Sequence, residues 1–110
     1  MHCEFDSIEL AQLPMAAQRM DLLAASAGRR IDLRPALDRY LAAWARRQPG
    51  ANLLDAMRLT DLVLRRQPDA VSDARLRWYA SVLADWTANP ATAPRAAAPL
   101  LRHYRQTLPL

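Results

Sequence analysis

Lysine is absent from the chain, and glycine occurs only twice in its 110 residues. All fifteen cationic side chains are therefore arginine, for which a GC-rich coding genome is the simplest explanation. Strand-favouring valine, isoleucine, threonine and phenylalanine are scarce, whereas alanine and leucine are abundant. The composition predicts an all-α, single-domain antiparallel helical bundle of about five helices over residues 1–110, with 52% of its residues apolar.

Cysteine is nearly missing as well, because Cys3 is the only one. A single cysteine excludes an intrachain disulfide and a cysteine-based zinc site. The first residues, MHCEFDSIE, lack the basic and apolar regions of a signal peptide. No apolar run approaches the roughly 20 residues that cross a bilayer. These absences predict a cytoplasmic protein without a membrane partner.

Catalytic motifs are missing too. The sequence has no phosphate-binding loop, no dinucleotide fingerprint, no H-E-x-x-H motif and no nucleophile elbow. His103 is expected on the polar side of the last helix, and the terminal His2, Cys3, Glu4 and Asp6 are not expected to bind a metal. We therefore predict a protein that is not an enzyme and that uses no cofactor or metal.

Prolines, glycines and capping residues divide the chain into helices. The main helices are expected at about 14–27, 32–48, 52–66, 72–88 and 99–108, after a short helix that begins at the D-x-x-E capping box of residues 6–9. Gly28 is expected to end the first main helix. The expected N-caps of the next three are Asp32, Asn52 and either Asp69 or Ser72. Residues 1–13 are interpreted as a loosely packed segment and residues 89–98 as a Pro- and Ala-rich connector.

The third main helix is apolar over most of its circumference, which predicts a central position in the bundle. Its one polar stripe has the i, i+3, i+7 spacing of an exposed helix edge, and consists of Arg58, Asp61 and Arg65.

Four letters, RRQP, occur twice, at residues 46–49 and 65–68. Each copy lies at an expected helix end, where arginine interacts favourably with the negative terminus and proline prevents continuation. Helices joined by short turns pack antiparallel, so the two copies are expected at opposite ends of the bundle. We interpret them as helix-termination signals rather than as one repeated binding motif.

The antiparallel order also predicts an arginine-rich end. The residues that begin the second helix or finish the third are Arg29, Arg30, Arg34, Arg65 and Arg66, and Arg75 and Arg77 begin the fourth helix nearby. Such a cluster suits the phosphates of a nucleic acid or an acidic protein surface. The alternative is a solvated end with interleaved capping aspartates. Nucleic acid is the less favoured ligand, because no helix-turn-helix, RNP or zinc-finger pattern accompanies the cluster.

Arg75 is expected on the apolar face of the fourth helix, beside Trp78, Tyr79 and Trp86. Three interpretations stay open: the helix starts at Ser72 and leaves Arg75 in a first turn that overhangs the core, Arg75 stacks on a ring within the fold, or the face binds a partner. Arginine, tryptophan and tyrosine together are typical of interface hot spots. We therefore name Arg75, Trp78, Tyr79 and Trp86 as a candidate protein-binding site.

These observations predict a small non-enzymatic protein–protein interaction module in a bacterial cytoplasm, of the adaptor, secretion-chaperone, toxin-immunity or inhibitor type. The expected partner is another protein with an acidic surface. A homodimer is a second form of this hypothesis, because three tryptophans are many for a small core. The alternative function is a basic nucleic-acid-binding regulator that uses the arginine-rich end.

Overall fold

The computed structural model describes residues 5–107, and side chains from residue 5 to residue 103. This part of the chain contains five α-helices, four short 3₁₀ helices and no strand, so the predicted all-α class is confirmed. The contacts fall into two compact units, Met1–Val71 and Ser72–Leu110. The extent of a single domain over residues 1–110 stays a prediction.

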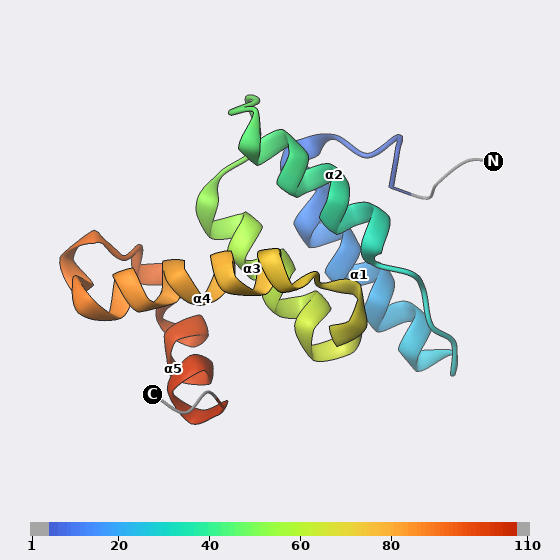
Figure 1. Ribbon diagram of the computed structural model, residues 1–110. Helices are drawn as coiled ribbons and strands as arrows, with labels where there is room; N and C mark the ends of the chain where they lie inside the picture. The colour runs from blue at the N-terminus through green and yellow to red at the C-terminus, as the bar shows by residue number, and fades with distance from the viewer. Residues whose placement is uncertain (1–4, 108–110) are drawn as a thin grey trace. The chain divides into compact units, whose positions relative to one another are not determined.

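The first unit is a three-helix bundle with two 3₁₀ helices. Its elements are η1 (Leu10–Gln12), α1 (Leu13–Ser26), α2 (Arg34–Ala45), α3 (Leu53–Arg66) and η2 (Pro68–Ala70). Every pair of its three α-helices is in contact. Consecutive α-helices run in opposite directions (Figure 1), as the short connections predict.

The core of this unit comes from one side of α1 and of α2 and from a wider arc of α3. On α1 the buried residues recur every three or four positions, at Leu13, Ala17, Asp21 and Ala24. On α2 a buried apolar stripe runs from Leu33 to Leu41, whereas Trp44 is half-buried. The large, fully buried side chains are Phe5, Leu13, Leu33, Leu37, Tyr40, Met57, Leu59 and Val63.

Two helices of the first unit end in the same hydrogen-bond pattern, a Schellman motif. After α1, Gly28 adopts φ +70°, its N–H donates to the Ala25 carbonyl at 3.0 Å, and the Arg29 N–H reaches the Ala24 carbonyl at 2.7 Å. The expected termination at Gly28 is therefore confirmed. After α2, Arg47 occupies the same position with φ +55°.

The N-caps follow the sequence prediction in two of three helices. The side chain of Asn52 accepts a hydrogen bond from the Asp55 N–H at 2.9 Å, and Ser72 accepts one from the Arg75 N–H at 3.2 Å. The second helix differs, because its N-cap is Leu33 rather than Asp32. The Asp32 carboxylate still accepts the Arg34 N–H at 3.0 Å, from one residue further out.

The N-terminal segment is attached to the bundle by one aromatic residue. Phe5 is 2% exposed, and its carbonyl accepts a hydrogen bond from the Arg39 guanidinium. Most side chains between Phe5 and Leu13 are exposed or half-buried. The expected capping box does not form, because η1 begins after Glu9 without a side-chain cap.

The second unit contains α4 (Asp73–Ala88), η3 (Pro90–Thr92), η4 (Arg95–Ala97) and α5 (Ala98–Thr107). The connector predicted at 89–98 thus holds two 3₁₀ helices. Helix α4 contacts η3 and α5. Among the described side chains of this unit, the buried ones are Tyr79, Leu83, Trp86, Ala97 and Leu100. The Tyr104 side chain and Leu108 lie outside the described residues.

Candidate interaction surface

The α4 residues predicted to bind a partner are largely part of the core. Helix α4 begins at Asp73 after the Ser72 cap, so Arg75 lies in the first turn, as one of the three interpretations stated. Tyr79 is 3% exposed and Trp86 is 6% exposed. Arg75 and Trp78 are half-buried. These two residues are the part of the predicted site that retains accessible surface.

The arginine-rich end forms in the first unit, because Gln67 links the end of α3 to the loop before α2. The Gln67 side-chain oxygen accepts the Leu33 N–H at 2.9 Å, and its amide nitrogen donates to the Ile31 carbonyl. The loop that carries Arg29 and Arg30 therefore lies beside the helix end that carries Arg65 and Arg66. Arg75 and Arg77 belong to the other unit.

Two of the five arginines at this end are paired with aspartates. Arg66 Nε lies 2.9 Å from Asp21 Oδ2, and Arg65 Nη2 lies 2.6 Å from Asp61 Oδ2. Asp61 is only 3% exposed, so its expected place on a solvated edge is wrong. The reason is the arginine one turn later, which compensates the buried carboxylate. Arg29, Arg30 and Arg34 form no ion pair with the residues that the structure describes.

Among the described residues, the most exposed of the large apolar side chains lie on α1. Met15 is 60% exposed, Leu22 is 59% exposed and Leu23 is 66% exposed. We call these three residues the α1 ridge. Helix α1 already buries its opposite side in the core, so the ridge is apolar surface left over after the bundle has formed. Large exposed apolar groups that gather on one element are typical of interaction surfaces.

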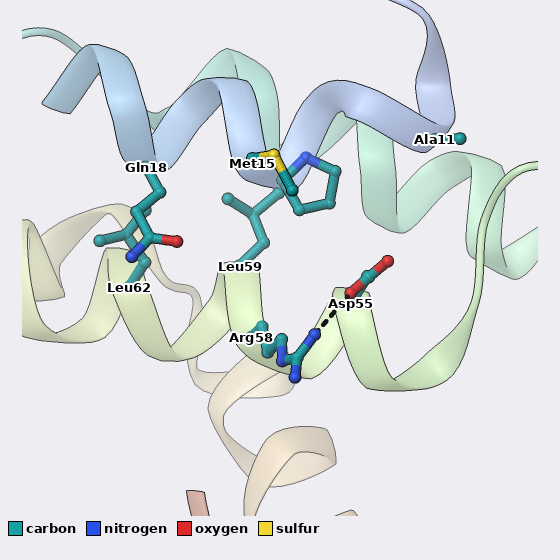
Figure 2. A pocket seen from close by; sticks show the side chains of 8 residues that line it. Ala11, Met15, Gln18, Asp55, Arg58, Leu59 and Leu62 are labelled. Carbon is teal, nitrogen blue, oxygen red and sulfur yellow. Dashed lines mark hydrogen bonds and ion pairs between the residues drawn. The ribbon is translucent and has the colours of Figure 1, made fainter. Parts of the chain in front are cut away.

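A groove runs along one side of the ridge, between α1 and α3, with a volume of about 370 Å³. Its lining residues are Ala11, Pro14, Met15 and Gln18 from the α1 side, and Asp55, Arg58, Leu59 and Leu62 from α3. Figure 2 shows Leu59 reaching from α3 toward α1, with Met15 above it on α1. Arg58 and Asp55 pair at 3.4 Å on α3, which gives the groove a polar margin and an apolar floor.

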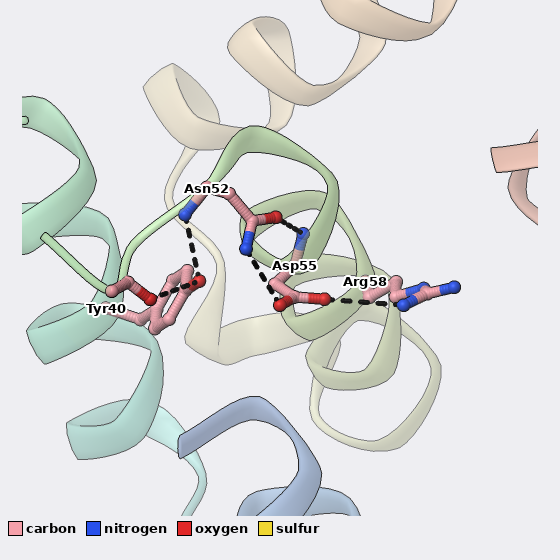
Figure 3. Close-up of polar contacts among 5 residues, drawn as sticks. Tyr40, Asn52, Asp55 and Arg58 are labelled. Atoms are coloured by element: carbon pink, nitrogen blue, oxygen red, sulfur yellow. Dashed lines mark hydrogen bonds and ion pairs between the residues drawn. The ribbon is translucent and has the colours of Figure 1, made fainter. Parts of the chain in front are cut away.

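The margin is held by a network at the start of α3 (Figure 3). The Tyr40 hydroxyl accepts the Asn52 N–H at 3.1 Å and donates to the Gly50 carbonyl at 3.5 Å. The Asn52 amide nitrogen donates to Asp55 Oδ2 at 3.0 Å, while Asp55 Oδ1 faces Arg58. Asp55 is therefore oriented by the cap on one side and by arginine on the other.

Tyr40 keeps its proton at neutral pH. Burial raises the pKa of the Tyr40 hydroxyl, and the nearby Asp55 carboxylate raises it further, against the opposing effect of the Asn52 N–H. The neutral hydroxyl can then act as donor and acceptor at once.

A second pocket of about 370 Å³ lies on the other side of the ridge, at the last turn of α1. We call it the arginine pocket, and its lining residues are Met20, Leu23, Ala24, Arg29, Arg30 and Ile31. The side chains of Arg29 and Arg30 are exposed, and Met20 and Ile31 are half-buried.

Sequence reasoning did not select the α1 ridge as a site. The available signal was that α1 carries large apolar residues on opposite sides of its axis, since Leu13 cannot share one face with Met15 and Leu22. An all-round apolar pattern is equally typical of a buried helix, so the pattern alone could not separate the two cases.

His103 is half-buried. Of the residues predicted not to bind a metal, Asp6 is exposed, and His2, Cys3 and Glu4 lie outside the described part of the chain. Among the described residues, no group of three or more His, Cys, Asp or Glu side chains could hold a metal ion. No helix of that part is both long enough and apolar enough to cross a membrane. No protein-family model, curated protein or solved structure matches the chain.

Proposed function

We propose that this protein is a small non-enzymatic protein-interaction module, an adaptor, chaperone or inhibitor, and that the α1 ridge with its adjoining groove is the docking surface. The exposure of Met15, Leu22 and Leu23 on a single helix carries the proposal. Covering such side chains on association is favourable by roughly 25 cal/mol for each Å² of apolar surface removed from water. The groove offers a partner a recess between two helices that are already in contact.

The polar groups of the groove serve structure, which supports a binding role rather than catalysis. Asp55 is held by Asn52 and Arg58, and the lining residues include no histidine, cysteine or serine that could act as base or nucleophile. A groove with an apolar floor and a charged margin is suited to the apolar stripe of a partner helix.

The test is affinity capture from the native host lysate with nuclease present. The ridge variant Met15→Ser/Leu22→Ser changes two exposed residues, so it should fold as the wild type does, which circular dichroism checks. Leu76→Ser is the matched control, because Leu76 is an exposed apolar residue of α4. We expect a protein that wild type and control retain and that the ridge variant loses. Equal capture by all three would remove the α1 ridge as docking surface.

A second candidate, the basic nucleic-acid-binding regulator, is favoured by the exposed Arg29, Arg30 and Arg34. Its cluster is smaller than the sequence predicted, because Arg65 and Arg66 already pair with aspartates. This function predicts that the captured material disappears with nuclease, and that binding of a DNA or RNA duplex weakens steeply as salt rises. The affinity capture should also include Arg75→Ala and Trp78→Ala, because these two α4 residues are the accessible part of the site that the sequence predicted.

A further inference from the structure

The arginine pocket combines an apolar floor with two guanidinium groups. Leu23, at 66% exposed, forms one wall, and Met20 and Ile31 contribute further apolar surface. Arg29 and Arg30 follow the Gly28 turn, so the chain reverses at the end of α1 and places both arginines beside the last turn of the same helix. A charged rim therefore lies directly against an apolar recess.

The backbone that carries the rim is fixed from two sides. On the α1 side, the Arg29 N–H donates to the Ala24 carbonyl at 2.7 Å, as the outer bond of the Schellman motif. On the α3 side, Gln67 binds the Ile31 carbonyl and the Leu33 N–H. Such preorganisation lowers the entropy lost when a ligand is bound.

The carboxylates close to the rim in sequence already have partners. Asp21 pairs with Arg66 at 2.9 Å, and Asp32 accepts the Arg34 N–H at 3.0 Å. Arg29 and Arg30 have no ion-pair partner in the described part of the chain. Neither carboxylate is ion-paired with Arg29 or Arg30, so both guanidinium groups can bind a ligand. The ligand that complements the pocket carries an anionic group attached to an apolar one.

We infer that the arginine pocket receives an acidic amphipathic helix of a partner protein. This inference rests on the proposed function, for which it names the partner. An apolar side chain of that helix enters between Leu23 and Ile31, and carboxylates one turn away pair with Arg29 and Arg30. Guanidinium groups bind carboxylates and phosphates alike. The apolar recess favours the peptide, because a phosphodiester backbone has no apolar side chain to fill it.

The experiment is a selection from a display library of helical peptides against the purified full-length protein, followed by affinity measurement with synthetic copies of the enriched peptides. Enriched sequences should carry leucine, isoleucine or phenylalanine at i, i+3 or i+4, with flanking Asp or Glu. The double variant Arg29→Gln/Arg30→Gln should weaken their binding by about tenfold, and added salt should weaken binding to the wild type. Leu23→Ser should weaken it as well.

The matched control is the double variant Arg46→Gln/Arg47→Gln. It replaces another pair of adjacent exposed arginines, at the opposite end of α2, and removes the same amount of charge. It should bind the peptides as the wild type does. Peptides without acidic bias that depend on Met15 and Leu22 but ignore Arg29 and Arg30 would overturn this inference and leave the proposed function standing. The selection could instead enrich no peptide while anionic phospholipid vesicles or duplex DNA bind through Arg29 and Arg30. That result would overturn both this inference and the proposed function.

Discussion

The Tyr40 hydroxyl serves two backbone groups at once, the Asn52 N–H and the Gly50 carbonyl. Tyr40 is fully buried, and removing its hydroxyl leaves both backbone groups without this partner. The ring packs in the core while the oxygen holds the turn between α2 and α3. One side chain thus contributes apolar burial and a turn constraint together.

Tyr40→Phe is expected to lower the free energy of unfolding at pH 7 by about 1–2 kcal/mol, because two polar groups lose their partner. The pH dependence follows from the raised pKa of Tyr40, since the folded state then favours the protonated hydroxyl. This contribution is fully present below the ordinary tyrosine pKa of about 10 and is lost as pH rises through the higher folded-state value.

Urea unfolding from pH 7 to pH 11 tests this, with the wild type and Tyr40→Phe compared at each pH. The stability difference between them should shrink as the pH rises above about 10. Other groups titrate equally in both proteins and cancel in the difference. Two curves that stay parallel to pH 11 would show that Tyr40 does not couple folding to deprotonation.

For single residues, the sequence predicted the roles that depend only on neighbouring positions, such as helix caps and helix ends. Gly28, Asn52 and Ser72 act within a few positions of themselves, so residue type and spacing identified their roles. Asp61 was misplaced for a different reason. Its burial depends on which side chains surround it in three dimensions, which helical spacing does not specify.

The sequence RRQP occurs at the ends of both α2 and α3, but the two helices end with different backbone conformations. After α2, the RRQP arginine Arg47 adopts a left-handed conformation, and the Gln48 N–H reaches back to the Ala43 carbonyl at 3.0 Å. After α3, Gln67 keeps a negative φ of −143°, and its side chain binds the α1–α2 loop instead. The prediction that both copies lie at helix ends is confirmed, while the way each one terminates its helix depends on the surroundings.

Arg47→Gly is expected to stabilise the protein by about 0.5–1 kcal/mol, because glycine adopts a positive φ without the steric cost that arginine has there. Gly28→Ala should lower the stability by a similar amount, because alanine is strained at the φ of +70° that Gly28 adopts. A Cβ at this position would meet nothing within 4 Å, so no steric clash adds to that backbone cost. Thermal unfolding of both variants measures the two shifts. A melting temperature lowered by Arg47→Gly would contradict the assignment.

The helix boundaries were predicted to within a few residues, because prolines, glycines and caps mark them locally. The sequence did not predict which side of α1 is exposed. Its periodicity is blurred by apolar residues on both sides, so the core side became evident only once α2 and α3 were seen packed against it. The interaction surface is therefore the part of the site that sequence patterns could not identify.

The whole molecule divides at residues 71 and 72 into two compact units. The first has a core of its own, with Leu13, Leu33, Leu37, Met57 and Val63 fully buried. The second is a segment of about 40 residues, the size below which an isolated chain usually needs disulfides, metals or a partner to fold. The fold class was predictable from composition, whereas this division arises from the distribution of contacts along the chain.

A chain truncated after Val71 is expected to stay helical and to unfold cooperatively in urea, with lower stability than the full chain because less apolar surface is buried. Residues 72–110 alone should show little helix at room temperature. Circular dichroism of both fragments measures this. A non-cooperative transition for residues 1–71 would show that the first unit depends on the second.

Gln67 also ties the loop that carries the rim of the arginine pocket to the end of α3, a helix that does not line the pocket. Its two side-chain bonds join residues 34 and 36 positions apart in the chain. The Leu33 amide proton is held by that side chain, so it exchanges with solvent deuterium only when the loop separates from the end of α3. The same opening frees the rim that carries Arg29 and Arg30. The exchange rate of one backbone proton thus reports how often the binding loop is released, and a partner bound at the rim would slow it.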